Sequence, residues 1–272
     1  MKVGFIGAGK MAKALCQGFI STGLINKSEI LASDINPSKL KEISRLGVQT
    51  TSCNREVVKK NDIVYVAVKP PLVREVLREV SPVVNPSNLF VSIAAGITTK
   101  TMEEVLPKGC RVIRVMPNIA VVVQAGACAY TPGTSAKNED VEVVTQMLTC
   151  VGSVEEIPEE LMDTVTGLSG NGPAYGFITI QGLADGGVKM GLNREQSTRL
   201  AAQLLLGAAK MVLGIDSHPE QMKDEVCSPG GTSIHALHKL EKSGFRAALV
   251  DAVEAGTLRS KELGKLFNKT AD

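Results

Sequence analysis

The chain has 272 residues, of which 44% are hydrophobic and 21% charged, the balance of a folded protein long enough for two domains. A net charge of +2 without a basic run argues against a nucleic-acid partner. No apolar stretch approaches the length of a membrane span, and the six cysteines show no metal-ligand spacing, so we expect neither a membrane nor a metal partner. Scattered cysteines are typical of a reduced, intracellular protein.

The N-terminal part alternates short apolar runs with amphipathic segments. Strands are expected over residues 3–7, 30–33, 48–50, 63–68, 89–93, 111–116, 127–130 and 153–156. Helices are expected over residues 10–21, 37–46, 71–80, 99–105 and 138–150. This alternation predicts βαβ units and an α/β fold, with a Rossmann-like doubly wound parallel sheet covered on both faces. Because the first strand begins at residue 2 or 3, we expect no cleaved leader and a cytoplasmic location, with an uncleaved mitochondrial signal left open.

After residue 157 the strand signals end and long helical patterns begin. These patterns cover residues 174–190, 195–213, 234–242 and 246–265. We therefore predict a doubly wound α/β domain over residues 1–157 and an all-α domain over residues 158–272.

One of the predicted helices contains four glycines, Gly176, Gly182, Gly186 and Gly187. Each glycine inside a helix costs ~1 kcal/mol relative to alanine. A broken helix is one interpretation. We favour the other, in which the glycines let a second helix approach closely, within the subunit or across a dimer.

The first chemical motif is G-x-G-x-x-A, formed by Gly7, Gly9 and Ala12 directly after the first apolar run. Gly7 permits a tight turn, Gly9 lets the backbone approach a pyrophosphate, and Ala12 allows the helix to lie close to the strand. The motif predicts a dinucleotide with its pyrophosphate at the positive end of the helix.

The end of the second predicted strand bears on the choice of cofactor. Asp34 is placed to accept a hydrogen bond from the ribose 2′-hydroxyl of NAD, whereas Ser33, Asn36, Ser38 and Lys39 surround it with groups suited to a 2′-phosphate. Asp34 repels a phosphate and Lys39 attracts it. These residues do not decide between NAD and NADP as the cofactor. We expect both to be used, with a moderate preference for NADPH.

Three further segments follow predicted strands, A-V-K-P over residues 67–70, S-I-A-A-G over 92–96 and R-V-M-P-N over 114–118. Loops at the carboxyl ends of parallel strands meet at one edge of the sheet, where ligands bind. We therefore expect these loops at the mouth of the cofactor cleft.

The second chemical motif lies near the C-terminus, C-S-P-G-G-T-S-I-H-A-L-H over residues 227–238. Two glycines and three hydroxyls precede a helical pattern, which is more than one N-cap needs. Bare N–H groups at a helix start bind anions, so residues 228–233 predict a site for a small carboxylate. We call these residues the carboxylate seat. His235 and His238 lack further metal ligands, and we interpret them as structural or surface residues.

Over its whole length the chain resembles the pyrroline-5-carboxylate reductases. The resemblance is carried by V-G-F-I-G-A-G-K-M-A, A-V-K-P, R-V-M-P-N, D-T-V-T-G-L-S-G-N-G-P-A-Y and, most specifically, V-C-S-P-G-G-T-S-I-H-A-L-H-K-L-E. It implies reduction of 1-pyrroline-5-carboxylate to L-proline by hydride transfer from NAD(P)H. It also implies an intertwined homodimer through the helical domain, able to assemble further. The family usually has threonine where this chain has Ser233.

The resemblance also assigns roles to residues. It places the substrate carboxylate at Gly230, Gly231 and Thr232, with Ser233 as the catalytic residue that binds the ring nitrogen, Ser228 supporting the loop, and Glu159 or Glu160 near the substrate. It gives a cofactor cleft lined by Gly7, Ala8, Gly9, Lys10, Met11, Asn54, Ala67, Val68, Lys69, Pro70, Ala95, Gly96, Met116, Pro117 and Asn118. Ser33, Asp34 and Lys39 complete the predicted cofactor residues.

Two alternatives compete with this interpretation. A β-hydroxyacid dehydrogenase would carry a catalytic lysine soon after its G-x-x-G-x-G turn, but here the turn at residues 167–172 is followed by no lysine until Lys189. A non-catalytic NADP-binding protein would have lost the carboxylate seat, which is intact.

Overall fold

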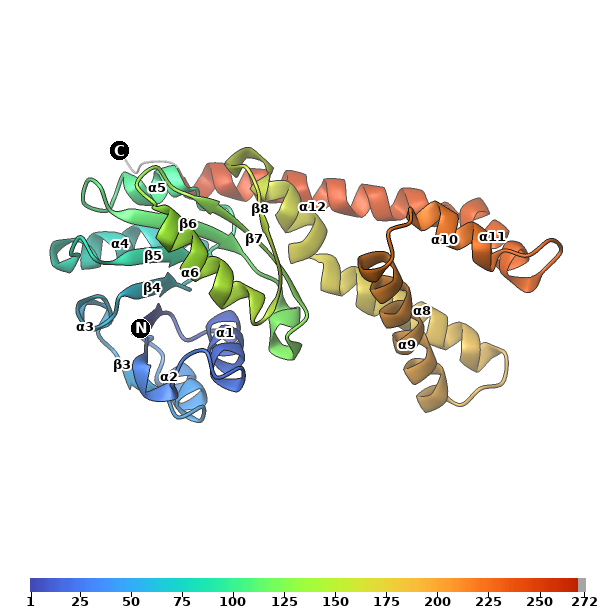
Figure 1. The fold of residues 1–272 in the computed structure, drawn as a ribbon, viewed down its shortest axis with the longest axis horizontal. Helices are drawn as coiled ribbons and strands as arrows, with labels where there is room; N and C mark the ends of the chain where they lie inside the picture. The colour runs from blue at the N-terminus through green and yellow to red at the C-terminus, as the bar shows by residue number, and fades with distance from the viewer. Residues whose placement is uncertain (269–272) are drawn as a thin grey trace. The chain divides into compact units, whose positions relative to one another are not determined.

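The computed structural model describes residues 1–268 and contains one eight-stranded sheet (Figure 1). The strands are β1 (Val3–Ile6), β2 (Ile30–Ser33), β3 (Gln49–Thr51), β4 (Ile63–Val66), β5 (Leu89–Ser92), β6 (Arg111–Met116), β7 (Gly126–Pro132) and β8 (Gly152–Glu156). Their spatial order is β3-β2-β1-β4-β5-β6-β7-β8, so the chain reverses direction across the sheet between β1 and β4. This is the topological switch point of a doubly wound fold, and the predicted fold class is confirmed.

One strand pair departs from the predicted parallel sheet. β7 runs antiparallel to β6, whereas the other neighbouring pairs of the described sheet are parallel. The link between β6 and β7 contains only the short 3₁₀ helix η4 (Ile119–Val123). A parallel pair needs a crossover of a dozen or more residues, so this short link forces the antiparallel arrangement.

Helices separate most of the strands. They are α1 (Lys10–Ser21), α2 (Pro37–Ser44), α3 (Asn54–Lys60), α4 (Val73–Val80), α5 (Thr99–Glu103) and α6 (Asn138–Thr149), with 3₁₀ turns η1 (Lys27–Glu29), η2 (Pro70–Leu72) and η3 (Ser81–Val83). Successive strand residues belong to different core clusters, with Phe5 and Tyr65 in one and Ile6 and Val66 in the other. The central strands are therefore buried on both faces, as their continuous apolar sequence predicts.

The chain divides into two compact units, and the division differs from the predicted boundary after residue 157. The first unit is residues 1–171 together with residues 254–268, and the second is residues 172–253. The segment η5 (Glu159–Leu161), α7 (Met162–Val165) and η6 (Thr166–Gly170, a π-helix) belongs to the first unit because Met162 is buried against Met116 and Ala129 of the sheet. Composition marks where the strands end, but not which helical turns contact the sheet.

The second unit is helical, as predicted. It contains α8 (Gly172–Lys189), α9 (Arg194–Gly214), α10 (Pro219–Val226), α11 (Thr232–Lys242) and the first part of α12 (Phe245–Phe267). Within residues 1–268, none of the helices is both long enough and apolar enough to cross a membrane.

The glycine-rich helix α8 is continuous, so the broken-helix alternative is wrong. A Cβ on Gly187 would lie 2.7 Å from Ser197 Oγ, which shows that this glycine allows α9 to approach closely. At Gly176, Gly182 and Gly186, no other described atom lies within 4 Å of a built Cβ. Space is therefore open at each of these three positions within one chain, and Phe177, which follows Gly176 in the sequence, is 66% exposed.

Candidate active site

The glycine-rich loop after β1 has the geometry that its sequence predicts. Gly7 has φ +101°, and a Cβ there would lie 2.7 Å from the Ala67 carbonyl oxygen. Its N–H donates to the Ser33 carbonyl at 2.8 Å, which ties the loop to the end of β2. Only glycine combines this positive φ with this close approach.

The start of α1 is open. Gly9 is its N-cap, no side chain among residues 1–268 caps it, and no described atom lies within 4 Å of a Cβ built on Gly9. Uncapped N–H groups beside empty space fit the pyrophosphate of a dinucleotide. Lys10 is exposed and Met11 half-buried at this helix start.

Asp34 follows β2 and holds the glycine-rich loop. Its Oδ2 accepts from the Ala8 N–H at 2.9 Å and its Oδ1 from the Asn36 N–H at 2.9 Å, and the Lys39 ammonium lies 3.6 Å away. The carboxylate is 8% exposed, whereas the neighbouring Ile35 is 86% exposed. Part of the charge of Asp34 is therefore balanced by the protein itself.

Ser33, the residue before Asp34, lies in the interior of the protein. It is completely buried, and its hydroxyl donates to Asn54 Oδ1 at 2.7 Å, while Asn54 Nδ2 donates to Glu79 Oε2 at 2.7 Å. Ser33 thus orients Asn54, a role that the sequence did not indicate, and its predicted contact with the cofactor stays a prediction.

The other predicted cofactor loops follow β4, β5 and β6. After β4, Ala67 and Val68 are half-buried and Lys69 is exposed. After β5, Ala95 is exposed and Gly96 is buried with φ +74°. At the end of β6, Met116 and the following Pro117 and Asn118 are buried.

Asn118 is held by its own loop and by η6. Its Oδ1 accepts from the Ala120 N–H at 3.1 Å, and its Nδ2 donates to the Ser169 carbonyl at 3.0 Å.

A cavity of about 280 Å³ lies at the edge of two of these loops, within the first compact unit. One side of the cavity is lined by residues that the sequence predicted for the cofactor, Pro70, Ala95 and Gly96. Sequence reasoning missed the remaining lining residues, which are Thr166, Asn171, Gly256, Arg259, Ser260, Leu263 and Phe267. No local pattern places the end of α12 beside the sheet.

The carboxylate seat has the form that the sequence predicts for an anion site. Gly230 has φ +68°, the Gly231 N–H donates to the Ser228 carbonyl at 3.0 Å, and α11 begins at Thr232. Gly231 is the N-cap, and no side chain in the described part of the chain caps this helix. The hydroxyls of this motif therefore do not serve as caps, and the first N–H groups of α11 stay available for an anion.

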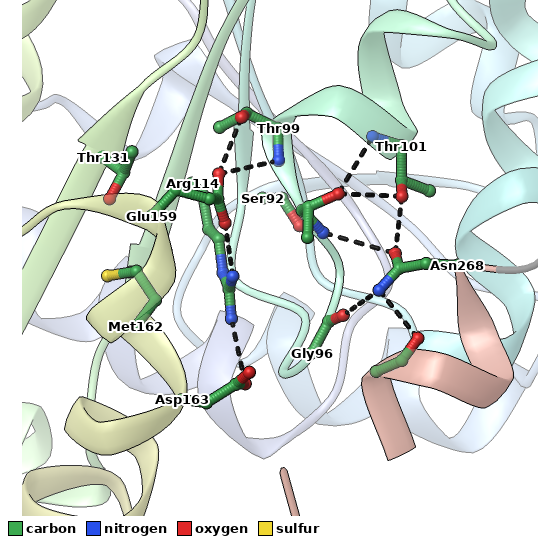
Figure 2. A network of polar contacts seen from close by, with 12 residues as sticks. Ser92, Gly96, Thr99, Thr101, Arg114, Thr131, Glu159, Met162, Asp163 and Asn268 are labelled. Atoms are coloured by element: carbon green, nitrogen blue, oxygen red, sulfur yellow. Dashed lines mark hydrogen bonds and ion pairs between the residues drawn. The ribbon is translucent and has the colours of Figure 1, made fainter. Parts of the chain in front are cut away.

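Figure 2 shows the contacts of Glu159 within the protein, and its predicted nearness to the substrate stays a prediction. Glu159 Oε1 is ion-paired with Arg114, and Oε2 accepts from the N–H and hydroxyl of Thr99 at 3.1 and 2.7 Å. Arg114 is only 2% exposed and also lies 3.7 Å from Asp163, which accepts from Ser260 at 2.7 Å. Glu159 joins β6 to the start of α5, with both carboxylate oxygens engaged.

The histidines and cysteines form no metal centre in the part of the chain that the structure describes. Among residues 1–268 there is no group of three or more His, Cys, Asp and Glu residues that could hold a metal ion. His235 Nδ1 lies 3.0 Å from the Gly231 carbonyl, so it contacts the seat's backbone.

Comparison with known proteins gives matches over the whole chain. Residues 159–263 match the family described as "Pyrroline-5-carboxylate reductase dimerisation", and residues 2–96 match "NADP oxidoreductase coenzyme F420-dependent". Pyrroline-5-carboxylate reductase 2 of Homo sapiens is 47% identical, over 99% of this chain and 86% of that protein. The pyrroline-5-carboxylate reductase of Methanosarcina acetivorans is 45% identical, over 97% of this chain and 98% of that protein.

Solved structures agree. A Plasmodium falciparum pyrroline carboxylate reductase with NADP bound has a TM-score of 0.89 and 34% identity, covering 97% of this chain and 98% of the other. A Coxiella burnetii pyrroline-5-carboxylate reductase has a TM-score of 0.88 and 32% identity, covering 99% of both chains. Prephenate dehydrogenase of Aquifex aeolicus, at 18% identity and a TM-score of 0.53, shares the fold alone.

Proposed function

The chain belongs to the pyrroline-5-carboxylate reductase family, and we propose that it reduces 1-pyrroline-5-carboxylate to L-proline with a hydride from NADPH. The observation that carries this proposal is the start of α11, where two glycines and an uncapped helix terminus leave backbone N–H groups free for a small carboxylate. An imine acid of this size carries one carboxylate, which this site suits.

The cofactor is assigned to the loops at the carboxyl edge of the sheet. The pyrophosphate would lie at Gly9 and the first turn of α1, where the open space fits it. Asp34 and Lys39 would face the adenine ribose. Because Asp34 already accepts two backbone N–H groups and lies 3.6 Å from Lys39, its repulsion of a 2′-phosphate is reduced. This supports use of both cofactors with a moderate preference for NADPH.

The nicotinamide end is assigned to the cavity beside Pro70, Ala95 and Gly96. Its volume of about 280 Å³ is at the small end of ligand pockets, which suits one ring rather than a whole dinucleotide. The bound cofactor would supply the hydride that adds to the carbon of the C=N bond. Thr166 and Asn171 would then present polar groups near the ring.

The chain's own residues would act mainly by orientation. A cyclic imine is readily protonated, which reduces the need for a dedicated acid, and positioning two reactants contributes up to ~7–11 kcal/mol in favourable cases. Ser233, half-buried on the first turn of α11, would hydrogen-bond the ring nitrogen directly or through water. Thr232 and the glycine backbone would hold the carboxylate, and Ser228 would support the turn.

The family described by the match to residues 159–263 is a dimerisation family, and we assign the open glycine positions of α8 to a homodimer contact. Glycines without neighbours in one chain leave room for the backbone of a second chain, and exposed Phe177 supplies apolar area. Dimers of this kind would assemble further into higher oligomers.

The deciding experiment is an assay with chemically prepared 1-pyrroline-5-carboxylate and NADPH, following both loss of NADPH and formation of L-proline. Stoichiometric proline supports the proposal. NADPH binding without turnover would favour the non-catalytic alternative. Turnover of β-hydroxy acids instead of the imine would favour the dehydrogenase alternative.

A further inference from the structure

The end of α12 contacts a loop that the proposed function assigns to the cofactor. Asn268 Nδ2 donates to the carbonyl of Gly96 at 2.7 Å, in the loop between β5 and α5. The same side chain accepts through Oδ1 from the Thr101 hydroxyl at 2.6 Å and from the Thr98 N–H at 3.4 Å. One amide therefore binds the loop and the start of α5 together (Figure 2).

Asn268 is itself firmly placed. Its Nδ2 also donates to the Gly264 carbonyl at 2.7 Å, and its own carbonyl accepts from Arg74 at 2.9 Å. The preceding Phe267 packs against the buried cluster that includes Ala94 and Ile97 on either side of the loop. The amide thus reaches the loop from an anchored helix end.

The approach of α12 to the loop leaves little room for a Cβ on either side. A Cβ on Gly264 would lie 3.2 Å from the Gly96 carbonyl oxygen, and a Cβ on Gly96 would lie 3.2 Å from Gly264 Cα. Gly96 has φ +74°, a conformation that glycine adopts without strain and other residues rarely adopt. The hydrogen bond from Asn268 and the close contact with Gly264 fix where this flexible position lies.

We propose that Asn268 is a positioning residue for cofactor binding, which holds the residue 94–98 loop so that Ala95 and Gly96 face the cavity. The proposal rests on the assignment of this loop to the cofactor. It requires an amide, because a single side chain must donate to Gly96 and accept from Thr101. An aspartate side chain has the same shape and could still accept from Thr101. Its second oxygen, however, would face the Gly96 carbonyl oxygen and repel it.

The test compares Asn268→Asp with Arg74→Ala. The control removes the bond to the Asn268 main chain but leaves the amide contacts with the loop. In a fluorescence titration, we expect Asn268→Asp to raise the Kd for NADPH about five- to tenfold, because the substitution removes one or two hydrogen bonds. Its KM for the imine should stay within about twofold of the parent value. Arg74→Ala should lower Tm and leave the Kd for NADPH within about twofold.

A second variant guards against poor folding of the first. Gly264→Ala removes no side-chain hydrogen bond but presses a methyl group on the Gly96 carbonyl, so it should also raise the Kd for NADPH. An unchanged Kd in both Asn268→Asp and Gly264→Ala would overturn the proposal, as would an equal rise in Arg74→Ala. Turnover of the imine by the parent enzyme tests the proposed function separately, so the two can fail independently.

Discussion

Replacing Gly231 by valine tests the carboxylate seat most directly. A Cβ at this position would lie 2.4 Å from Ser228 Oγ and 3.1 Å from the Ser228 carbonyl oxygen, so the turn must shift or the side chain must cover the helix start. The backbone has φ −75° and ψ 168°, which any residue adopts, so the effect comes from the side chain. Loss of one or two N–H bonds to a carboxylate, about 1.5–3 kcal/mol each, predicts a rise in KM for the imine of about 10-fold to about 10⁴-fold.

The assay is steady-state kinetics in the imine at saturating NADPH, with NADPH binding followed separately by fluorescence. Gly9→Val is the matched control, because Gly9 is also an uncapped helix N-cap with extended backbone. It should weaken NADPH binding and leave KM for the imine nearly unchanged, the reverse of Gly231→Val. An unchanged KM for the imine in Gly231→Val would place the substrate carboxylate elsewhere.

Five further substitutions test four single residues. Ser233→Ala should lower kcat while Ser233→Thr keeps it near the parent value, and equal rates for alanine and serine would remove this hydroxyl from catalysis. Lys39→Glu should shift the ratio of kcat/KM values toward NADH. Asp34→Ser should shift this ratio toward NADPH and weaken the binding of both cofactors, because the Ala8 N–H loses its acceptor. A parent enzyme that strongly prefers NADH, with a preference unaffected by Lys39→Glu, would contradict this. Arg114→Ala should lower the free energy of unfolding by about 3–5 kcal/mol in urea titrations, since it leaves Glu159 and Asp163 without their buried cation. A loss below about 1 kcal/mol would show that this ion pair is dispensable.

The two chemical motifs could be recognised from the sequence because each one is local. The spacing of Gly7, Gly9 and Ala12 lies within one strand–turn–helix unit, and the seat depends on six consecutive residues. The backbone conformations that these glycines permit are intrinsic to glycine. The alternation of strands and helices is likewise a local periodicity, and it predicted the doubly wound sheet correctly.

Local patterns did not reveal the contacts between distant parts of the chain. Asn268 binds Gly96 across 172 positions, and Arg114 meets Glu159 across 45. The same holds for the direction of β7, the burial of Ser33 and the return of α12 to the first unit. A polar residue such as Glu159 has the same local signature whether it meets a substrate or a buried arginine. Its partner is set by packing, because burying Arg114 without a carboxylate would be costly, and that requirement arises only when the chain is folded.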